Sequence, residues 1–526
     1  MDVLIVGAGF GGLYMLHRAR RMGLRALALD AADGVGGTWY WNRYPGARCD
    51  IESLEYSFGF DEALQQEWRW TERFAAQAEI LAYANHVADR FALRPHLRLG
   101  TRVVSAVFDD DAARWQVATD KGDTLEARFL VMATGCLSSA NLPDIAGRDT
   151  FGGRTFHTGR WPHEPVEFTG RRVGVIGTGS SAVQAIPVIA REAKELVVFQ
   201  RTATYSVPAR NAPLDPAEEA QVKADYAGLR RRNRQMMNAF GARYPRRDVA
   251  CAGASPEERE RAFEERWQKG GLFYLGAFND LMLDAGANAA AAEFVRRKIR
   301  AVVQNPETAM LLTPTQAIGC KRLCIDTGYY EAFNRPNVHL LDVTDTPIQR
   351  ITAKGVIAGG REFALDDLVF ATGFDAMTGA LARIDIRGTG GVSLAERWAA
   401  GPRNYLGLSV AGFPNLFMIT GPGSPSVLTN MMVSIEQHVE WISDCLAAMA
   451  SAGHVRIEAQ PGAEDAWVAH VNAVADRTLF AGCNSWYLGA NVPGKPRVFM
   501  PLVGFPAYAT KCDEVAAKGY EGFTLR

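Results

Sequence analysis

Val3-Leu-Ile-Val-Gly7-Ala-Gly9-Phe10-Gly-Gly12 is the stretch of this chain that predicts its fold. Four consecutive apolar residues are typical of a central parallel strand, and a helical run from Leu13 to Met22 follows the glycines. In this dinucleotide-binding fingerprint Gly7 permits a tight turn, Gly9 lets the backbone approach a pyrophosphate, and Gly12 permits close contact between helix and strand. The N–H groups at the start of the helix then face the phosphates.

A carboxylate completes this first fingerprint. The next expected strand, Leu24 to Leu29, ends at Asp30, which lies 23 residues after Gly7. A carboxylate at that place can accept hydrogen bonds from both hydroxyls of an unphosphorylated adenosine ribose. The first site is therefore expected to hold FAD or NAD.

A second fingerprint begins in the middle of the chain. An expected strand from Val173 to Ile176 enters Gly177-Thr178-Gly179-Ser180-Ser181-Ala182, and a helix follows that we expect to be bent or interrupted near Pro187. At the ribose position, 24 residues after Gly177, stands Arg201 instead of an acid. Because arginine suits a 2′-phosphate that an acid would repel, the second site is expected to hold NADP.

Both halves of the chain end in the same way. Residues 115–135 read as a hairpin and a buried strand, Phe129 to Met132, that leads to Ala133-Thr-Gly135. Residues 356–370 read as a second hairpin, with one strand from Phe363 to Phe370, that leads to Ala371-Thr-Gly373. We therefore predict an α/β fold with two Rossmann-like dinucleotide-binding domains and, where the sequence turns Ala-rich and charged, a helical insertion in the second. The expected boundaries are 1–140 and 375–526 for the first domain, 141–212 and 311–374 for the second, and 213–310 for the insertion.

Composition limits the classes of partner. The chain has 526 residues with 57 basic and 58 acidic side chains, so its net charge of -1 does not favour nucleic acid or an anionic membrane. A signal peptide and a long apolar run are both missing from the sequence, so we expect a soluble, cytoplasmic protein with no required protein partner. The eight cysteines form no C-x-x-C pair, and Cys320 and Cys324 lack partners at zinc spacing. We therefore expect reduced thiols, with neither a metal site nor a disulfide framework.

The linker between the two fingerprints carries a further pattern, Phe151-x-Gly153-x-x-x-His157-x-x-x-Trp161-Pro162. Taken alone it could be a Gly-rich loop with one buried histidine. Between two fingerprints it resembles the signature of the flavin-dependent Baeyer–Villiger monooxygenases, which insert one oxygen atom of O2 beside a ketone carbonyl. The resemblance is closest to the phenylacetone and steroid monooxygenase branch and extends in order over Gly36–Asp50, Gln200–Thr202, Lys321-Arg322, Gly421–Asn430, Asn484–Trp486 and Gly489–Lys495.

Lys321 and Arg322 stand side by side in the second half of the chain. They could be an ordinary basic pair on the surface. The functional interpretation is that the reaction needs a permanent cation, because a flavin C4a-peroxide must stay anionic to attack a carbonyl and the adduct is anionic as well. Asp50 would be the carboxylate that orients Arg322, and Lys321 could reach the NADP phosphate.

The resemblance also implies the cofactors and their contacts. FAD is expected on the first site and NADPH on the second, with ketone and O2 as small-molecule substrates. Beyond Gly7, Gly9, Phe10, Gly12, Asp30 and Gly37, the residues expected near FAD are Thr38, Trp39, Tyr40, Trp41, Tyr56 and Met431. Those expected near NADPH are Arg48, Cys49, Asp50, Gly177, Thr178, Gly179, Ser180, Ser181, Ala182, Gln184, Arg201, Thr202, Lys321, Arg322 and Trp486.

Two further pairs have expected roles. His157 and Trp161 would couple the two domains rather than transfer oxygen. Val427 and Leu428 are apolar residues on a loop, so we expect them to line and narrow the substrate pocket, although they could simply anchor the loop.

Three other functions fit parts of the sequence. A flavin monooxygenase that oxygenates nitrogen or sulfur shares the fold, but its linker signature lacks the closing Trp-Pro; sulfoxidation would also be a side activity of the favoured enzyme. A disulfide reductase would need the missing C-x-x-C. A nucleotide-sensing module would not need Asp50, Lys321 and Arg322 together.

Overall fold

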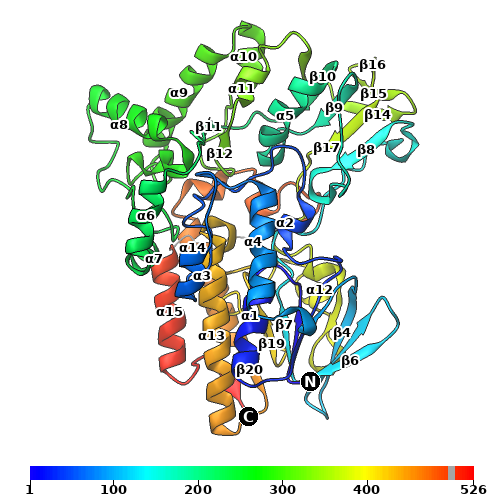
Figure 1. The fold of residues 1–526 in the computed structure, drawn as a ribbon, viewed down its shortest axis with the longest axis vertical. Coiled ribbons are helices and arrows are strands. Elements are labelled where there is room, and N and C mark those ends of the chain that lie inside the picture. Colours follow the sequence, from blue (N-terminus) through cyan, green and yellow to red (C-terminus); the bar gives the residue numbers. More distant parts are fainter. Residues whose placement is uncertain (496–503) are drawn as a thin grey trace.

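The computed structural model describes residues 1–495 and 504–526, and these form two halves, each built on a parallel sheet. Figure 1 shows β7 (Phe129–Met132) and β19 (Leu416–Met418) of one sheet in the lower half, together with both chain termini, and β9 (Arg172–Ile176) and β10 (Glu195–Gln200) of the other sheet in the upper half. This arrangement agrees with the prediction of an α/β fold with two dinucleotide-binding sheets.

The lower sheet has the strand order β19-β7-β1-β2-β3, and every neighbouring pair is parallel. The predicted strands Val3–Val6 (β1) and Phe129–Met132 (β7) are confirmed, and β1 is buried over its whole length. The remaining strands of this sheet are β2 (Ala26–Leu29), β3 (Leu97–Arg98) and β19 (Leu416–Met418).

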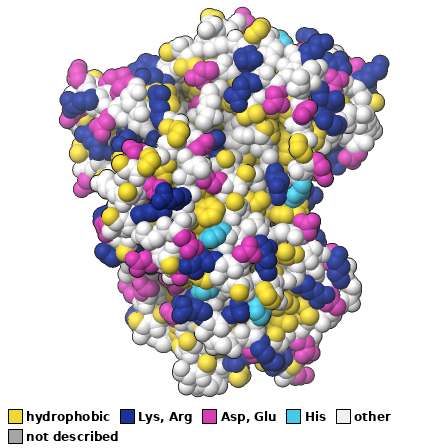
Figure 2. Space-filling view, viewed as in Figure 1, with side chains coloured by type: hydrophobic (Ala, Val, Ile, Leu, Met, Phe, Trp, Pro, Cys, Tyr) yellow, Lys and Arg dark blue, Asp and Glu magenta, His cyan; other side chains and the backbone are white. Residues whose placement is uncertain are grey.

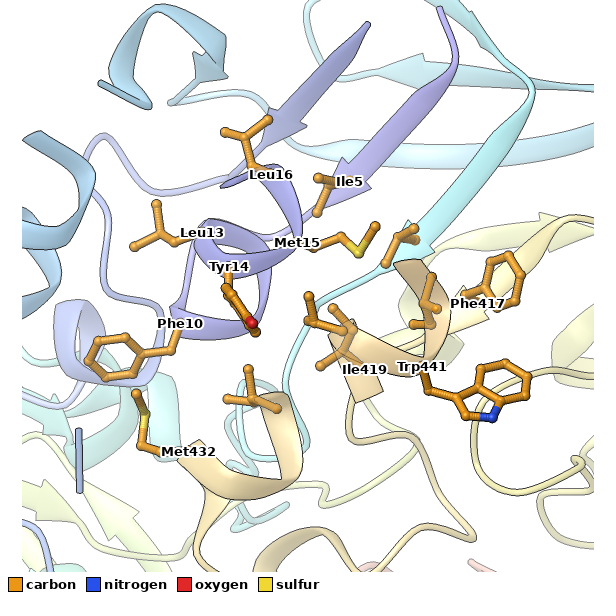
Figure 3. Packing of buried hydrophobic residues seen from close by; sticks show 14 of the residues in the cluster. Ile5, Phe10, Leu13, Tyr14, Met15, Leu16, Phe417, Ile419, Met432 and Trp441 are labelled. Carbon is orange, nitrogen blue, oxygen red and sulfur yellow. The ribbon is translucent and has the colours of Figure 1, made fainter. Parts of the chain in front are cut away.

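Two helices cover one face of this sheet. Figure 3 shows α1 (Phe10–Arg21) packed between β1 and the start of α13 (Met431–Ala452). Leu13, Met15 and Leu16 of α1 are completely buried, as is Met432 of α13. Burying each such side chain contributes about 1.5–3 kcal/mol, so this contact holds the N-terminus of α1 firmly against the sheet.

The upper sheet has the order β13-β10-β9-β17-β8, again entirely parallel. Its strands are β8 (Arg154–His157), β9 (Arg172–Ile176), β10 (Glu195–Gln200), β13 (Val338–Asp342) and β17 (Asp367–Phe370). Helix α5 (Ser180–Glu192) follows β9 and continues through Pro187, so the possible interruption there is not found.

The strand expected from Phe363 to Phe370 is wrong. It divides into β16 (Arg361–Ala364), which pairs with β15 (Gly355–Ala358), and β17 in the upper sheet. The break falls at Asp366, whose carboxylate accepts from the backbone N–H of Arg172 at 2.8 Å. Asp367 is fully buried and accepts from the guanidinium groups of Arg154 and Arg171. At these ion pairs the chain leaves the sheet that contains β15 and β16 and enters the upper sheet.

A group of helices lies in the sequence between the strands β11 (Ser206–Pro208) and β12 (Cys324–Asp326), and these helices contact both halves of the molecule. They are α6 (Pro216–Ala224), α7 (Tyr226–Arg234), α8 (Pro256–Lys269), α9 (Ala285–Val302) and α10 (Pro306–Leu312). Ser255 accepts from the N–H of Glu258 and begins α8, as its capping pattern predicts. Helices α8 and α9 share the core of the upper sheet, whereas Tyr226 and Leu229 of α7 pack in the lower core.

Smaller elements complete the fold. β18 (Asp385–Arg387), β4 (Val103–Asp109), β5 (Arg114–Thr119) and β6 (Thr124–Ala127) form a separate sheet, in which β5 and β6 are the predicted hairpin. The others are α2 (Thr38–Trp41), α3 (Glu62–Glu67), α4 (Gln77–Arg90), β11 (Ser206–Pro208), β12 (Cys324–Asp326), α11 (Tyr329–Ala332), β14 (Ile348–Thr352), α12 (Leu394–Arg397), β20 (Ile457–Ala459), α14 (Pro461–Ala475), α15 (Phe505–Ala517) and β21 (Phe523–Leu525).

Basic and acidic side chains are interspersed over the face drawn in Figure 2, as the near-zero net charge leads one to expect. Among the described helices, none combines the length and the apolar character that crossing a membrane requires.

Candidate active site

The first fingerprint forms a turn that only glycine fits. Gly7 has φ +115°, and a Cβ there would lie 2.3 Å from the carbonyl oxygen of Ala133. A Cβ on Gly12 would lie 1.8 Å from the oxygen of Gly7, which is the close approach of helix to strand end that its position predicts. Gly9 faces Gly37, with 3.4 Å between a Cβ on Gly9 and the Gly37 Cα, so the two loops expected near FAD meet here.

Asp30 already holds this turn in place. Its Oδ2 accepts from the backbone N–H of Ala8 at 2.6 Å and its Oδ1 from that of Ala32 at 2.8 Å. Burial raises the pKa of Asp30, although these two hydrogen bonds act in the opposite direction. Each oxygen keeps a further lone pair, so Asp30 could bind ribose hydroxyls while it orients the fingerprint.

The aromatic residues expected near the flavin gather beside this turn. Trp39 and Tyr40 of α2 are buried, and the Trp39 indole donates to the hydroxyl of Tyr56 at 3.0 Å. Tyr40 bonds to Asp33, whereas Met431, the first residue of α13, packs against the separate cluster that contains Val427 and Tyr487. Trp39, Tyr40 and Tyr56 make a largely apolar wall next to a glycine turn, which suits a flat ring system attached to a pyrophosphate.

The second fingerprint has open space beside its middle glycine, Gly179, whereas another loop lies against Gly9 of the first fingerprint. A Cβ on Gly179 would meet no atom within 4 Å, and Gly179 and Ser180 are exposed at the N-terminus of α5. Among residues 1–495 and 504–526 no side chain caps this helix end, so its backbone N–H groups are directed at the open space. Thr178 donates to the carbonyl of Thr202 at 2.8 Å and so joins the fingerprint to the end of β10. The site therefore has the room and the donors that a second dinucleotide needs.

Two of the residues expected near NADPH make structural contacts with each other. The Gln184 amide donates to the Arg48 carbonyl at 3.1 Å, and its oxygen accepts from the Tyr44 hydroxyl at 2.8 Å. The Arg48 guanidinium pairs with Glu72 at 2.8 Å. Gln184 thus fixes the segment that carries Cys49 and Asp50 against α5.

Arg201 and Lys321 form a pair of cations. Burial and the charge of Arg201 lower the pKa of Lys321. Within residues 1–495 and 504–526 neither side chain has an ion pair with a carboxylate. Two mutually repelling cations beside the open helix N-terminus fit a group with several negative charges, such as a 2′-phosphate.

Arg322 and Asp50 form the predicted pair, although they lie 272 residues apart. The guanidinium donates through Nε and Nη2 to the two carboxylate oxygens, each at 2.7 Å, and through Nη1 to the carbonyl of Val427 at 2.5 Å. Burial alone would lower the pKa of Arg322, but Asp50 and Tyr487 together raise it above its usual range. The cation is permanent and its direction is fixed.

Tyr487 was not identified from the sequence, although the neighbouring Trp486 was. It hydrogen-bonds to Arg322, and burial raises the pKa of Tyr487 to about 12, so the hydroxyl stays neutral. Its ring lies 4.4 Å from that of Trp486. The signal that could have found it is its place directly after the motif tryptophan, in a segment that must cover the arginine.

The expectation of reduced thiols is wrong for Cys320 and Cys483, which form a disulfide with 5.5 Å between their Cα atoms. The two cysteines are 163 residues apart, and only the fold brings them together. The other six cysteines are free and buried. Nowhere in the described chain do three or more His, Cys, Asp or Glu side chains gather as metal ligands would.

His157 and Trp161 lie where the linker meets both halves. Burial lowers the pKa of His157 to about 4, and its ring reaches the backbone of Asn141 and Gly373. The backbone N–H of Trp161 donates to the carbonyl of Trp41 in α2 at 3.3 Å. These contacts suit the coupling role, which stays a prediction.

Val427 and Leu428 belong to one apolar cluster over Arg322. Val427 is buried and Leu428 is partly buried, and the cluster to which they belong also contains Tyr487 and the two disulfide-bonded cysteines. Their position at the cluster is compatible with a pocket wall, and the Val427 carbonyl has the additional task of holding Arg322.

Known proteins resemble the chain over its full length. Residues 4–228 match the family described as pyridine nucleotide-disulphide oxidoreductase. A Baeyer–Villiger monooxygenase of Pseudooceanicola batsensis is 44% identical over 99% of this chain and 95% of its own. The phenazine N-monooxygenase PhzNO1 of Lysobacter antibioticus is 42% identical over 100% of this chain and 97% of its own.

A solved structure shows the same architecture. The oxidised steroid monooxygenase bound to NADP superposes with a TM-score of 0.95 at 51% identity, covering 100% of this chain and 99% of that one. Together with the fixed Arg322–Asp50 pair and the two fingerprints, these similarities show that the chain belongs to the Baeyer–Villiger monooxygenase family.

Proposed function

We propose that this protein oxidises ketones to esters or lactones with NADPH and O2, holding FAD in the first dinucleotide site and NADPH in the second. Bound FAD, once reduced, would supply the electrons that activate O2 for transfer. The observation that supports this best is the fixed direction of Arg322 between Asp50, Val427 and Tyr487.

Arg322 can stabilise negative charge on the reacting oxygen atoms. A guanidinium has five N–H donors, and the Asp50 carboxylate and the Val427 carbonyl engage three of them. The Tyr487 hydroxyl lies beside the group, and a donor that these neighbours leave free can face the reactants. Because its partners already fix the group, little reorganisation is needed when charge develops, which is the condition under which such a cation stabilises a transition state most.

The other assigned residues prepare the two cofactors. Asp30 and the glycine turn would bind the adenosine diphosphate part of FAD, and Arg201 with Lys321 would bind the 2′-phosphate of NADPH. Val427 and Leu428 would bound the ketone site. The proposal includes the domain limits 1–140 with 375–526, 141–212 with 311–374, and a helical insertion at 213–310.

The proposal further includes a cytoplasmic enzyme that works without a protein partner. Activity of the purified chain alone, and its recovery after cell fractionation, test these two points.

Arg322→Ala tests the role of the cation. Under nitrogen, NADPH should still reduce the bound flavin, followed by its absorbance, because hydride transfer does not depend on a cation at the oxygen site. In air, ester formation should be lost, and Arg322→Lys should recover only part of it because lysine cannot bind Asp50 with a fork. Ester formation by Arg322→Ala at near the wild-type rate would refute the assignment.

Oxygenation of nitrogen is the second candidate function, because a relative of equal coverage is named a phenazine N-monooxygenase. A ketone, an aromatic nitrogen heterocycle and a thioether, each supplied with NADPH, separate the two. Ester as the dominant product supports the proposal, sulfoxide as a minor product is compatible with it, and N-oxide without ester favours the alternative.

A further inference from the structure

The disulfide between Cys320 and Cys483 lies next to the arginine on which the proposed function depends. Cys320 comes two residues before Arg322, and Cys483 comes four residues before Tyr487. Tyr487 and Arg322 are themselves joined by a hydrogen bond. The covalent link and the hydrogen bond therefore connect the same two segments within one short ring.

The sulfur atoms face the site rather than the solvent. Cys320 is 6% exposed and Cys483 is 2% exposed. Both belong to the apolar cluster over Arg322, which also contains Val427, Tyr487 and Leu488. An oxidant that reaches them most readily is therefore one that arises inside this site.

Charge around Cys320 favours reactivity of the free thiol. Lys321 follows it directly and forms no ion pair with any residue in 1–495 or 504–526, and Arg322 stands one residue further on. A nearby cation stabilises a thiolate, which is the form that attacks a peroxide. Cys483 has no basic residue beside it in the sequence, since Gly482 and Asn484 flank it.

We propose that Cys320 and Cys483 are a peroxide-responsive pair whose crosslink holds the segment Leu479–Leu488 on Arg322 and slows the release of NADP+. This rests on the proposed function, because the oxidant we name is hydrogen peroxide formed when NADPH and O2 react without a ketone: NADPH, one proton and O2 give NADP+ and H2O2. Thiols can reopen the crosslink by thiol–disulfide exchange.

The chemistry balances with one peroxide for each crosslink. The Cys320 thiolate attacks one peroxide oxygen, the O–O bond breaks, and a sulfenic acid and hydroxide form. The Cys483 thiol then attacks the sulfenic sulfur, the S–O bond breaks, and the S–S bond forms. The two thiol protons end in two water molecules, so two thiols are oxidised while one peroxide is reduced.

The consequence for the nucleotide follows from the position of Trp486. This residue, an expected NADPH contact, lies between Cys483 and Tyr487. When the disulfide is formed, the few residues between Cys483 and Trp486 limit how far Trp486 can move away from the site. With the thiols reduced, non-covalent contacts alone hold the segment, among them the Leu479 backbone N–H on the Met282 carbonyl and the apolar packing of Tyr487, so the nucleotide can escape sooner.

Formation of the crosslink is measured first. The FAD-loaded, thiol-reduced enzyme is incubated with NADPH in air without ketone, in parallel with samples under nitrogen and samples with catalase. Free thiols are then alkylated, and unreduced peptides are examined by mass spectrometry. The peptide that joins Cys320 to Cys483 should accumulate in air and much less under nitrogen. Both thiols fully alkylated after addition of H2O2 itself would overturn the proposal.

The two proposals fail separately in this experiment. If added H2O2 forms the crosslink but the enzyme supplied with ketone, NADPH and air makes no ester, the proposed function is contradicted and the reactive pair stands. If peroxide is produced but neither it nor added H2O2 joins the pair, the pair is not peroxide-responsive.

Release of NADP+ is measured second, by rapid dilution and filtration of enzyme loaded with labelled NADP+. The crosslinked enzyme should release NADP+ several-fold more slowly than the reduced enzyme. Cys483→Ser should release it at the fast rate whether or not reductant is present. Cys251→Ser, which changes a buried free cysteine in the loop before α8, should keep the wild-type response to reductant. Equal release by crosslinked and reduced enzyme would overturn the effect on the nucleotide.

Discussion

Arg201→Ala should weaken the use of NADPH selectively. Arg201 is exposed, lies just after β10, and its charge acts on Lys321. A hydrogen bond to a charged group contributes about 1.5–3 kcal/mol, which corresponds to about a 10- to 150-fold loss in kcat/KM. Because solvent screens an exposed arginine, we expect a loss near about tenfold for NADPH. NADH, which lacks the 2′-phosphate, should be used as before.

The same substitution should change the pH dependence of this preference. Burial and the charge of Arg201 both lower the pKa of Lys321, so Lys321 loses its proton at a lower pH than an ordinary lysine. As pH rises, the wild-type enzyme should therefore lose its preference for NADPH at a lower pH than it would if Lys321 had the pKa of an ordinary lysine. Removing Arg201 removes one of the two causes, so the remaining preference should persist to higher pH.

Initial rates with NADPH and NADH, measured over a range of pH with one ketone, supply both results. Arg191→Ala is the matched control, because Arg191 is an exposed arginine at the C-terminal end of α5, away from the open fingerprint. It should leave both cofactors unaffected. Equal losses with NADPH and NADH in Arg201→Ala would refute the assignment of the 2′-phosphate site.

Three further predictions concern other parts of the molecule. Gly179→Ala should leave the melting temperature unchanged, because its Cβ meets no atom within 4 Å, yet raise the KM for NADPH; a fall in melting temperature with an unchanged KM would contradict this. Burial raises the pKa of Glu436 to about 7, so the folded state holds a proton that the unfolded state loses near 4.5, and stability should fall as pH rises through that interval. Glu436→Gln should flatten this slope in urea titrations, and an unchanged slope would show that the group does not titrate there. Val427→Ala should admit bulkier ketones while its backbone carbonyl still holds Arg322, whereas deleting Val427 and Leu428 would also remove that acceptor; an unchanged range of ketones would leave the loop as scaffold.

The sheets could be predicted because their signals are local. Val3–Val6 and Phe129–Met132 are short apolar runs, each followed closely by glycine, and this pattern indicates a buried parallel strand. The pairing of Asp50 with Arg322 could be predicted from chemistry and resemblance, since a buried guanidinium needs a carboxylate. Boundaries were harder to predict where ion pairs decide them, as at Asp366, because its arginine partners are distant in the sequence.

Other parts of the site leave no sequence signal. Arg322 is held by the backbone carbonyl of Val427, and because every residue has such a carbonyl, the residue type at position 427 does not reveal this contact. The Cys320–Cys483 bond depends on two segments meeting, and spacing along the chain does not reveal that. Tyr487 is one of 15 tyrosines, and only its contact with Arg322 separates it from those that fill the core.

The measurement that tests the central claim most directly is the fate of labelled oxygen. The purified, FAD-loaded enzyme is given a ketone, NADPH and 18O2, and the products are analysed by mass spectrometry. We predict an ester or lactone that carries one 18O atom, in the ring or chain position beside the original carbonyl, with about one NADPH consumed for each product, as the insertion of a single oxygen atom requires. Consumption of NADPH with labelled peroxide as the only oxygenated product would contradict the account.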